Sequence, residues 1–455
     1  MILPNLLQTA LAFPEKEALV SGARCLTYAT LVEEVLVRGA KIRAGFSEKT
    51  LILAQSDPTE NLIDLLGAMA VGKTAIFASR QVVPAQIKQL LTAHHAALLD
   101  DATAAYLPDV APLSAEEICP AKPGDRFLGV LTSGTEAAPR VIFKDYQCWV
   151  SAFPHQSDVF GIGPDDRLLV LDALGYSANL NAALHLLWQG GTVVLTTLAS
   201  AGSWLRQIEE HRISSVFMVP SHYRLWATKK GSMPGLKSLV SAGEKLDATT
   251  ARGLLTACPN TRLTEYYGAA ELGHVSYHQN DDILRYGYSV GRAFPGVDIR
   301  IHEQQILVES PYVSPDFRGV NSVFDLGAWE GERLVLLGRS GRMFNRRGLN
   351  VFAEELESQA RQLPFVREVA AVGKRRADGS HDLFVAFSAR HPHAPTVDYG
   401  RELRAFLLKN LPPAKQPRRT AQFANLPRRD TGKIDYEAVL RLFGEEDSSS
   451  TSRKF

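Results

Sequence analysis

One short segment of the chain combines hydroxyl, glycine and cationic residues in a pattern suited to phosphate binding. Residues 131–140 read LTSGTEAAPR: the hydroxyls of Thr132, Ser133 and Thr135 surround the flexible Gly134, and the cation Arg140 ends the segment. Hydroxyl and amide donors in such a loop can surround phosphate oxygens, and an arginine adds charge-assisted hydrogen bonds. Because loops of these residues are also common as plain turns, the segment alone leaves both interpretations open.

A second glycine segment matches a nucleotide-binding pattern but lies in the wrong context. Residues 67–74, GAMAVGKT, match GxxxxGK[ST], which binds phosphates when a strand precedes the loop and a helix follows it. Here the preceding residues carry apolar side chains at helical spacing, and the following TAIFAS resembles a strand. We therefore expect a helix that ends near Gly72 as its C-cap, and no phosphate role for Lys73.

The elements that must position these residues alternate along the chain. Apolar β-branched runs at 168–171, 192–195 and 216–219 are strand candidates, and residues 179–188 have the apolar pattern of a helix between the first two. This βαβ order predicts parallel sheets covered by helices, that is, an α/β fold.

A charged, glycine-containing run, GRSGRMFNRRG at 338–348, interrupts this order. A smaller α/β unit follows, with elements expected at 354–362, 368–372, 383–387 and 402–408. We expect a large N-terminal domain of layered sheets and helices over 1–340 and a small C-terminal domain over 341–445. The polar residues 446–455 are expected to form a disordered tail.

Composition argues against several classes of partner. The 455 residues are 45% apolar and 22% charged with a formal net charge of +1, so no charge excess favours nucleic acid or an anionic membrane. No apolar run reaches the roughly 20 residues that span a bilayer, and no basic leader precedes the first apolar stretch. We therefore expect a cytoplasmic protein without a membrane span. The scattered cysteines indicate neither a disulfide framework nor a metal site.

Four further segments follow the phosphate-loop candidate in a characteristic order. They read EYYGAAELG at 265–273, VFDLG at 323–327, GRSGRMFNRRGLNVFAEELE at 338–357 and LPRRDTGKIDYEAV at 426–439. Together with LTSGTEAAPR they resemble the signature motifs of the adenylate-forming superfamily, the AMP-binding enzymes that include acyl- and aryl-CoA synthetases, adenylation domains and luciferases. The resemblance extends over most of the chain. It implies a large N-terminal AMP-binding domain and a small C-terminal lid.

The resemblance also implies which residues bind ATP. The phosphates would be held by Thr132, Ser133, Gly134, Thr135 and Arg140. The adenine site would comprise Ser241, Ala242 and Gly243 of SAGEKL and Tyr267, Gly268, Ala269 and Ala270 of YYGAA. The aromatic face of Tyr267 suits the flat adenine ring. Asp325 would accept hydrogen bonds from both ribose hydroxyls, with Arg339 nearby.

The chemistry of acid activation would rest on Arg140, Glu271 and Lys433. Glu271 would hold Mg²⁺, a hard cation that prefers oxygen ligands and bridges phosphates. Lys433 would donate to the attacking carboxylate and the α-phosphate. Cations are needed there because two like unit charges about 4 Å apart repel by about 4 kcal/mol at an effective dielectric constant near 20. Negative charge grows at phosphorus in the transition state, so a fixed donor lowers the barrier.

Several positions depart from the family pattern. Ala270 stands where threonine is usual, and Ala137 and Val141 replace glycines of the phosphate loop. The loop is therefore expected to be stiffer. Gly341 occupies the position of the hinge between the two domains.

The acid is expected to bind along residues 173–182, ALGYSANLNA, and near Tyr267. Tyr176, which follows Gly175, lies where it could close the pocket to long chains and favour an aromatic or short acid. Alternatively, Tyr176 packs in the pocket wall without selecting a substrate.

These patterns predict an acid–thiol ligase that uses ATP and Mg²⁺. The acid forms acyl-AMP and pyrophosphate, and a phosphopantetheine thiol, on CoA or on an acyl carrier protein, then displaces AMP. One alternative is a protein that binds nucleotide or acyl-adenylate without turnover. A P-loop NTPase that uses Lys73 is another.

Overall fold

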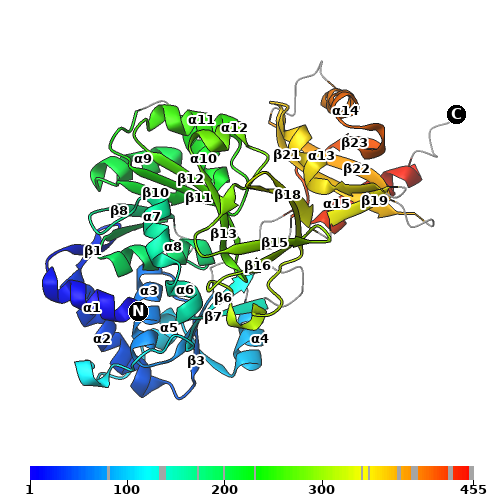
Figure 1. Ribbon diagram of the computed structural model, residues 1–455. Helices are drawn as coiled ribbons and strands as arrows, with labels where there is room; N and C mark the ends of the chain where they lie inside the picture. The colour runs from blue at the N-terminus through cyan, green and yellow to red at the C-terminus, as the bar shows by residue number, and fades with distance from the viewer. Residues whose placement is uncertain are drawn as a thin grey trace. The chain divides into compact units, whose positions relative to one another are not determined.

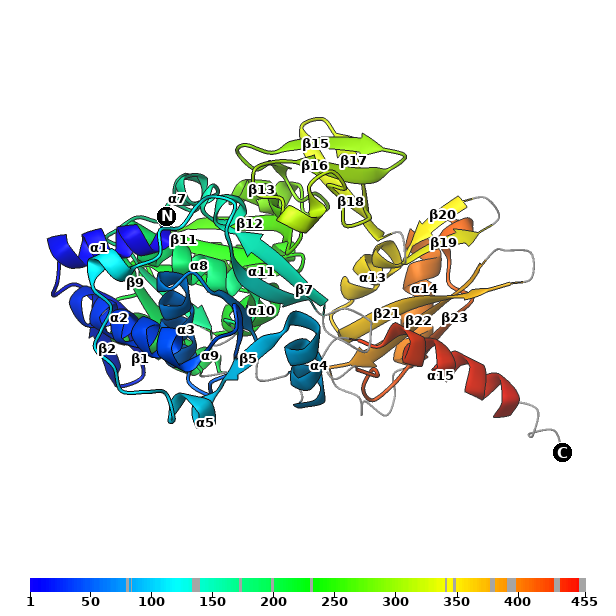
Figure 2. The ribbon, with the colours of Figure 1, turned by 90° about the horizontal axis from the view of Figure 1, so that it is seen from below.

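The fold is that of a computed structural model of the chain. The structure describes residues 1–78, 82, 84–132, 140–171, 174–197, 200–229, 232–339, 342–346, 349–376, 381–390, 398–428 and 434–449. The predicted α/β fold is confirmed, with helices and strands alternating along the chain (Figures 1 and 2). Two compact units are present: Met1–Arg300 with Leu307–Val323 and Trp329–Val335, and Ile301–Ile306 with Phe324–Ala328 and Leu336–Phe455.

The described residues of the first unit form a nine-stranded sheet. Its spatial order is β14 (Arg292–Ala293), β13 (Gly273–Gln279), β12 (Arg262–Ala269), β11 (Ser238–Ala242), β10 (Ser215–Met218), β8 (Arg167–Leu171), β9 (Thr192–Thr196), β1 (Glu17–Ser21) and β2 (Arg24–Thr27). In this spatial order, each pair of neighbouring strands from β12 through β11, β10, β8 and β9 to β1 is parallel. The outer strands β2, β13 and β14 pair antiparallel. The strands predicted at 168–171, 192–195 and 216–219 are β8, β9 and β10.

Helices cover both faces of this sheet. On one face, α9 (Ala201–Glu210), α10 (Pro220–Ala227) and α11 (Ala248–Ala257) form a buried core with Val216, Leu239 and Leu263. Successive strand residues point to opposite faces. Phe217 and Val240 therefore lie on the other face, with α7 (Phe153–Phe160) and the predicted helix α8 (Ser177–Gln189).

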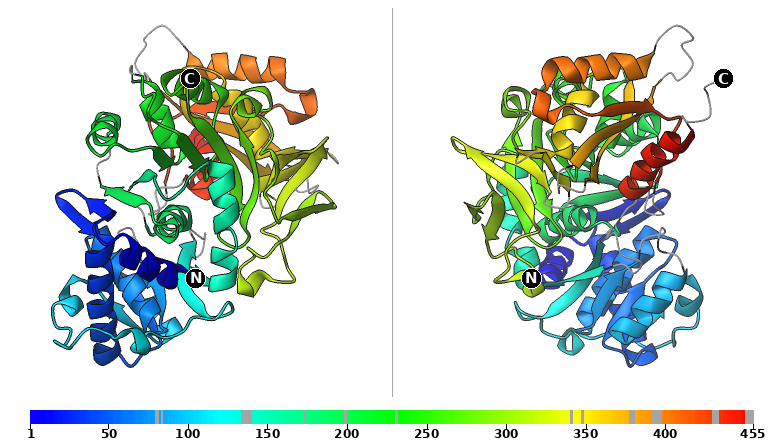
Figure 3. Two further views of the ribbon diagram at one scale, coloured as in Figure 1. Left: turned by 60° about the vertical axis from the view of Figure 1, so that its left-hand side comes forward. Right: turned by 90° about the vertical axis from the view of Figure 1, so that its right-hand side faces the viewer.

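A five-stranded sheet in the described part of the first unit has the order β5 (Ala96–Leu99), β3 (Thr50–Leu53), β4 (Thr74–Phe77), β6 (Arg126–Thr132) and β7 (Arg140–Asp145). The blue N-terminal helices pack beside it: α1 (Ile2–Ala12) on α2 (Tyr28–Gly45), and α2 on α3 (Pro58–Ala70) (Figure 3). The remaining helices of this unit are α4 (Pro84–His94), α5 (Asp101–Ala104), α6 (Tyr146–Val150) and α12 (Asp281–Arg285).

The structure confirms that the GAMAVGKT segment joins a helix to a strand. α3 ends at Ala70, and Gly72 follows in the left-handed region at φ +67° before β4 begins at Thr74. This conformation costs glycine little. Lys73 Nζ donates to the carbonyl oxygens of Phe46 at 2.9 Å and Glu48 at 2.6 Å, so it anchors the turn.

A four-stranded sheet contains β15 (Asp298–His302), β16 (Gln305–Glu309), β17 (Asp325–Glu330) and β18 (Arg333–Arg339), in that order in the described residues. The division between the two compact units passes through its strands.

The second unit has its own core. Its elements are β19 (Met343–Arg346), β20 (Leu349–Phe352), α13 (Ala353–Arg361), β21 (Val366–Arg375), β22 (His381–Ala389), α14 (Tyr399–Asn410), β23 (Arg419–Gln422) and α15 (Tyr436–Ser449). The sheet β21-β22-β23 has α13 and α14 on one face and α15 on the other (Figure 2). Alternation along β21 explains this, because Val369 and Ala371 join the first cluster while Ala370 and Val372 join the second.

The expected domain boundary differs in detail from the compact units. The segments Phe324–Ala328 and Leu336–Arg339 group with the second unit, whereas the sequence analysis assigned them to the N-terminal domain. The boundary after residue 340 stays a prediction, since residues 340–341 lie outside the described part of the chain. α15 extends to Ser449 and so includes the beginning of the expected tail.

Candidate functional site

The phosphate-loop candidate connects two paired strands. β6 and β7 form an antiparallel hairpin in which Thr132 lies opposite Arg140, so the two ends of the expected loop are adjacent. Ser133, Gly134 and Thr135 lie outside the described residues. Arg140 is exposed, and its guanidinium carbon lies 5.1 Å from the ring centroid of Phe317.

The two expected adenine segments lie at the carboxyl ends of neighbouring parallel strands. In the β11–β12 pair, Ser241 lies opposite Glu265 and Ala242 opposite Tyr266, so Ser241 to Gly243 and Tyr267 to Ala269 lie at the same edge of the sheet. Ligands of open α/β sheets bind at this edge. Ser241 is fully buried, and its hydroxyl has no hydrogen-bond partner among the described residues. Gly243 has φ +92°, which permits a tight turn directly after β11.

Gly268 is required by the close approach of β12 and β13. A Cβ at this position would lie 2.3 Å from the carbonyl oxygen of Gly273, and the register of the two strands shifts between Tyr267 and Gly268. Such irregularities bend a strand and redirect its side chains. The absence of a side chain here therefore sets the path from Tyr267 to Ala270.

A buried charged cluster of Lys245, Glu265 and His278 links the two expected adenine segments. Lys245 Nζ and His278 Nε2 each lie 2.5 Å from Glu265 Oε2, and the backbone N–H of Leu246 donates to Glu265 Oε1 at 2.6 Å. Burial opposes ionisation of Glu265, but Lys245 and His278 outweigh it and hold the pKa of Glu265 below its usual value. The cluster ties the SAGEKL turn to β12.

Lys144 connects the β6–β7 hairpin, which carries the ends of the expected phosphate loop, to the end of β12. Its buried ammonium donates to the carbonyl oxygen of Ala270 and, at 2.6 Å, to Ser314 Oγ. Ser314 in turn donates its backbone N–H to the carbonyl oxygen of Glu271 at 2.8 Å. Burial lowers the pKa of Lys144. The structure thus brings the hairpin that carries Arg140 and the segment that carries Glu271 together through a lysine that the motifs did not identify.

The remaining expected ligands belong to the second unit. Asp325 is buried at the start of β17, directly after Phe324 with φ +62°, and Arg339 ends β18. Lys433 and Gly341 lie outside the described residues. The structure therefore assembles the predicted adenine, phosphate-hairpin and Glu271 positions within the first unit, and places Asp325 and Arg339 on neighbouring strands of the four-stranded sheet.

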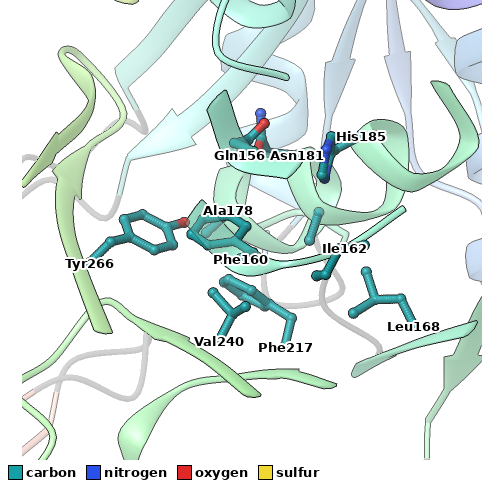
Figure 4. Close-up of a pocket in the computed structure, with 11 residues that line it drawn as sticks. Gln156, Phe160, Ile162, Leu168, Ala178, Asn181, His185, Phe217, Val240 and Tyr266 are labelled. Atoms are coloured by element: carbon teal, nitrogen blue, oxygen red, sulfur yellow. The ribbon is translucent and has the colours of Figure 1, made fainter. Parts of the chain in front are cut away.

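A cavity lies between the nine-stranded sheet and the helices α7 and α8 (Figure 4). Strand residues Leu168, Phe217, Val240 and Tyr266 line one side. The helices contribute Gln156, Phe160, Ala178, Asn181, Ala182 and His185, and Ile162 follows α7. The cavity and its opening to solvent together contain about 280 Å³ of empty space.

The expected pocket residues are only partly at this cavity. Ala178, Asn181 and Ala182, in the predicted 173–182 segment, line it. Gly175, Tyr176 and Tyr267 are not among its described lining residues, and the neighbouring Tyr266 is. Tyr176 precedes α8 as its N-cap with half of its surface exposed.

The sequence motifs do not identify Gln156 of α7 or His185 of α8. Both are buried polar residues. Asn181 and His185 are four residues apart and share one face of α8, which is the signal that could have identified His185. Burial lowers the pKa of His185 to about 3.

The described residues fit Mg²⁺ only together with nucleotide phosphates. No group of three His, Cys, Asp or Glu side chains in the described ranges could hold a metal ion alone. Mg²⁺ bound to phosphates needs only one or two protein carboxylates, and the partly buried Glu271 can supply one.

The described helices include none long and apolar enough to cross a membrane.

The chain is similar in sequence to proteins named as CoA ligases. The chain is 28% identical over 418 residues to an uncharacterized acyl-CoA ligase, YhfT, of Bacillus subtilis, covering 83% of this chain and 85% of that protein. It is 25% identical over 491 residues to 3-hydroxybenzoate–CoA ligase of Aromatoleum sp., covering 92% of each.

A solved structure shares the fold. O-succinylbenzoate coenzyme A synthetase (MenE) of Bacillus subtilis, in complex with AMP, matches with a TM-score of 0.84 at 18% identity, covering 95% of this chain and 97% of that one. The model of the AMP-binding enzyme family matches residues 6–312. The resemblance inferred from the motifs is thereby confirmed, and the chain belongs to the family of AMP-binding, adenylate-forming enzymes.

Proposed function

We propose that this protein is an acid–thiol ligase that activates a carboxylic acid with MgATP and transfers the acyl group to the thiol of CoA. The observation that supports this proposal best is the convergence within the first unit. Lys144 and the Lys245–Glu265–His278 cluster link the hairpin of Arg140, the segment of Glu271 and the expected adenine segments at the carboxyl ends of β11 and β12. The relatives named as CoA ligases support CoA as the thiol.

Charged side chains of the protein would each bind a different part of the reacting complex. Glu271 would hold Mg²⁺ against the phosphates, and Arg140 would donate to phosphate oxygens. Lys433 would place a cation between the acid carboxylate and the α-phosphate, where two anions otherwise repel. The fixed donors act most strongly on the charge that develops at phosphorus. Asp325 and Arg339 would bind the ribose.

The acid is proposed to be aromatic or short. The relative named 3-hydroxybenzoate–CoA ligase supports an aromatic acid. An acyl carrier protein in place of CoA, and a cytoplasmic location, remain predictions of the sequence analysis. A thioester assay with each acceptor and cell fractionation test them.

Acid-dependent ATP–pyrophosphate exchange, followed by thioester formation with CoA, tests the proposal. We expect exchange with some aromatic or short-chain acids and thioester only when CoA is added. Lys433→Ala should slow exchange by about two to three orders of magnitude, the scale for loss of one preorganised donor. The same variant should still form thioester from synthetic acyl-adenylate.

The alternatives give different results. Tight ATP binding without exchange for any acid would show a nucleotide-binding protein. Acid-independent phosphate release that is lost in Lys73→Ala would show an NTPase. Equal losses of both half-reactions in Lys433→Ala would contradict the role of that lysine.

A further inference from the structure

The cavity between the sheet and α7–α8 has chemically different sides. Figure 4 shows Gln156, Asn181 and His185 together on one side and Phe217, Val240 and Leu168 on the opposite side. Phe160 and Tyr266 lie between them with their rings stacked at a centroid distance of 5.7 Å. An acid that enters this cavity therefore meets apolar walls and one polar patch.

The polar patch contains a hydrogen-bond acceptor without a partner. Gln156 is 1% exposed. Its Nε2 donates to Asn181 Oδ1 and lies 3.0 Å from His274 Nε2. Gln156 Oε1 has no hydrogen-bond partner among the described residues. Buried acceptors are almost always paired, so this oxygen is suited to a donor on a ligand.

The polar patch carries no charge. None of the described residues that line the cavity is Asp, Glu, Lys or Arg. Burial lowers the pKa of His185 to about 3, and burial, together with His185 and Lys144, lowers that of His274 to about 3, so both rings are neutral at pH 7. A second carboxylate or an ammonium group would be buried here without a counter-charge, which is strongly unfavourable.

Position restricts the group further. Val240 and Tyr266 line the cavity, and the residues that follow them in the same strands, Ser241 and Tyr267, belong to the expected nucleotide site. An acid whose carboxylate reacts at the strand ends would therefore direct its other end into the cavity.

We propose that Gln156 is a specificity-determining residue that selects a small monocarboxylic acid with a neutral hydrogen-bond donor, a hydroxyl, at the end remote from the carboxylate. The inference rests on the proposed acid-activating function. The hydroxyl donates to Gln156 Oε1, while Phe160, Phe217 and Val240 contact the carbon skeleton.

Matched acids test this proposal with the full-length protein. Each set has an unsubstituted acid, its hydroxy acid and its dicarboxylic acid: benzoic, 3-hydroxybenzoic and benzene-1,3-dicarboxylic acid, the corresponding 4-substituted set, and hexanoic, 6-hydroxyhexanoic and hexanedioic acid. We expect kcat/KM for ATP–pyrophosphate exchange to favour the hydroxy acid by at least about tenfold in one or more sets, because the unsubstituted acid leaves the amide oxygen unpaired. The dicarboxylic acids should be the poorest substrates.

Variants of α7 separate the amide from general packing. In Gln156→Leu and Gln156→Met the ratio of kcat/KM between hydroxy and unsubstituted acid should fall to about one. Because both acids are measured on the same preparation, partial unfolding cancels from the ratio. Asp158→Ala, on the same helix, should keep the preference, since Asp158 is exposed and is not among the described lining residues.

Four outcomes would overturn the inference. Equal use of hydroxy and unsubstituted acids in every set, or a preference for a dicarboxylic acid, would contradict it and leave the proposed function intact. An unchanged ratio in both Gln156 variants would show that another residue selects the hydroxyl. If no acid supports exchange, the proposed function itself fails, and this inference fails with it.

Discussion

Glu271 lies where the β6–β7 hairpin is connected to the end of β12. Its backbone carbonyl oxygen accepts from Ser314 at 2.8 Å, and its side chain interacts electrostatically with Lys144. Glu271→Gln keeps the shape and removes the charge. We expect the apparent affinity for Mg²⁺ in pyrophosphate exchange to fall by about tenfold, which corresponds to about 1.4 kcal/mol, and excess Mg²⁺ to restore part of the rate.

The control for this substitution is Glu309→Gln, which changes an exposed carboxylate on β16. It should leave the Mg²⁺ dependence as in the wild type. An unchanged Mg²⁺ dependence in Glu271→Gln would remove Glu271 from the metal site.

His185 makes the stability of the first unit depend on pH. The folded pKa is about 3, against 6.5 for an ordinary histidine. Between these values the unfolded chain binds a proton that the folded chain does not, so the free energy of unfolding decreases as pH falls below 6.5. The slope is at most about 1.4 kcal/mol per pH unit. Above pH 6.5 the residue contributes no pH dependence.

Urea unfolding of wild type and His185→Gln at pH 7 and pH 5 measures this effect. The wild type should lose up to about 2 kcal/mol more than the variant between the two values. His274 remains in both proteins, and burial, the main cause of its lowered pKa, acts in both. Equal losses would show that His185 takes up its proton in the folded state.

At the scale of elements, the contact between β12 and β13 determines where Tyr267 to Ala270, the second expected adenine segment, lie. Gly268→Ala places a methyl group against the carbonyl oxygen of Gly273, so the strands must separate or shift. We expect a loss of about 1–3 kcal/mol in stability, the usual range for overpacking, and weaker ATP binding because Tyr267 moves with the strand. Thermal unfolding and ATP titration measure the two effects.

Gly124→Ala is the matched control, because a Cβ there meets no atom within 4 Å. It should leave both quantities unchanged. If Gly268→Ala binds ATP like the wild type, the path of β12 beyond Tyr267 does not position the adenine.

At the scale of the whole molecule, the chain has two units with separate hydrophobic cores. The family resemblance predicts that the smaller domain moves about Gly341 between the two half-reactions. Hinge residues absorb large changes in φ and ψ, and glycine tolerates both states, whereas proline restricts φ to about −65°. Gly341→Pro should therefore impair the half-reactions unequally, most strongly thioester formation.

Single-turnover measurements of adenylation and of thioester formation test this expectation. Wild-type rates for both steps in Gly341→Pro would place the pivot elsewhere, and Ser340 and Arg342 would be the next positions to substitute.

The sequence by itself determined the family, the α/β fold and most of the elements. These depend on local patterns: the periodicity that predicts α8 and β8 to β10, and the helix-before-strand order that argued against a P-loop at Lys73. The motifs also predicted both adenine segments, because each is a continuous stretch of chain.

Only the tertiary structure decided which distant residues support these segments. Lys144 contacts Ala270 and Ser314, and Gln156 contacts Asn181 and His274. These contacts depend on the order of strands in the sheets and on which helix covers which face. Local periodicity constrains neither, because a side chain buried against a distant strand follows the same local pattern as one in any apolar core.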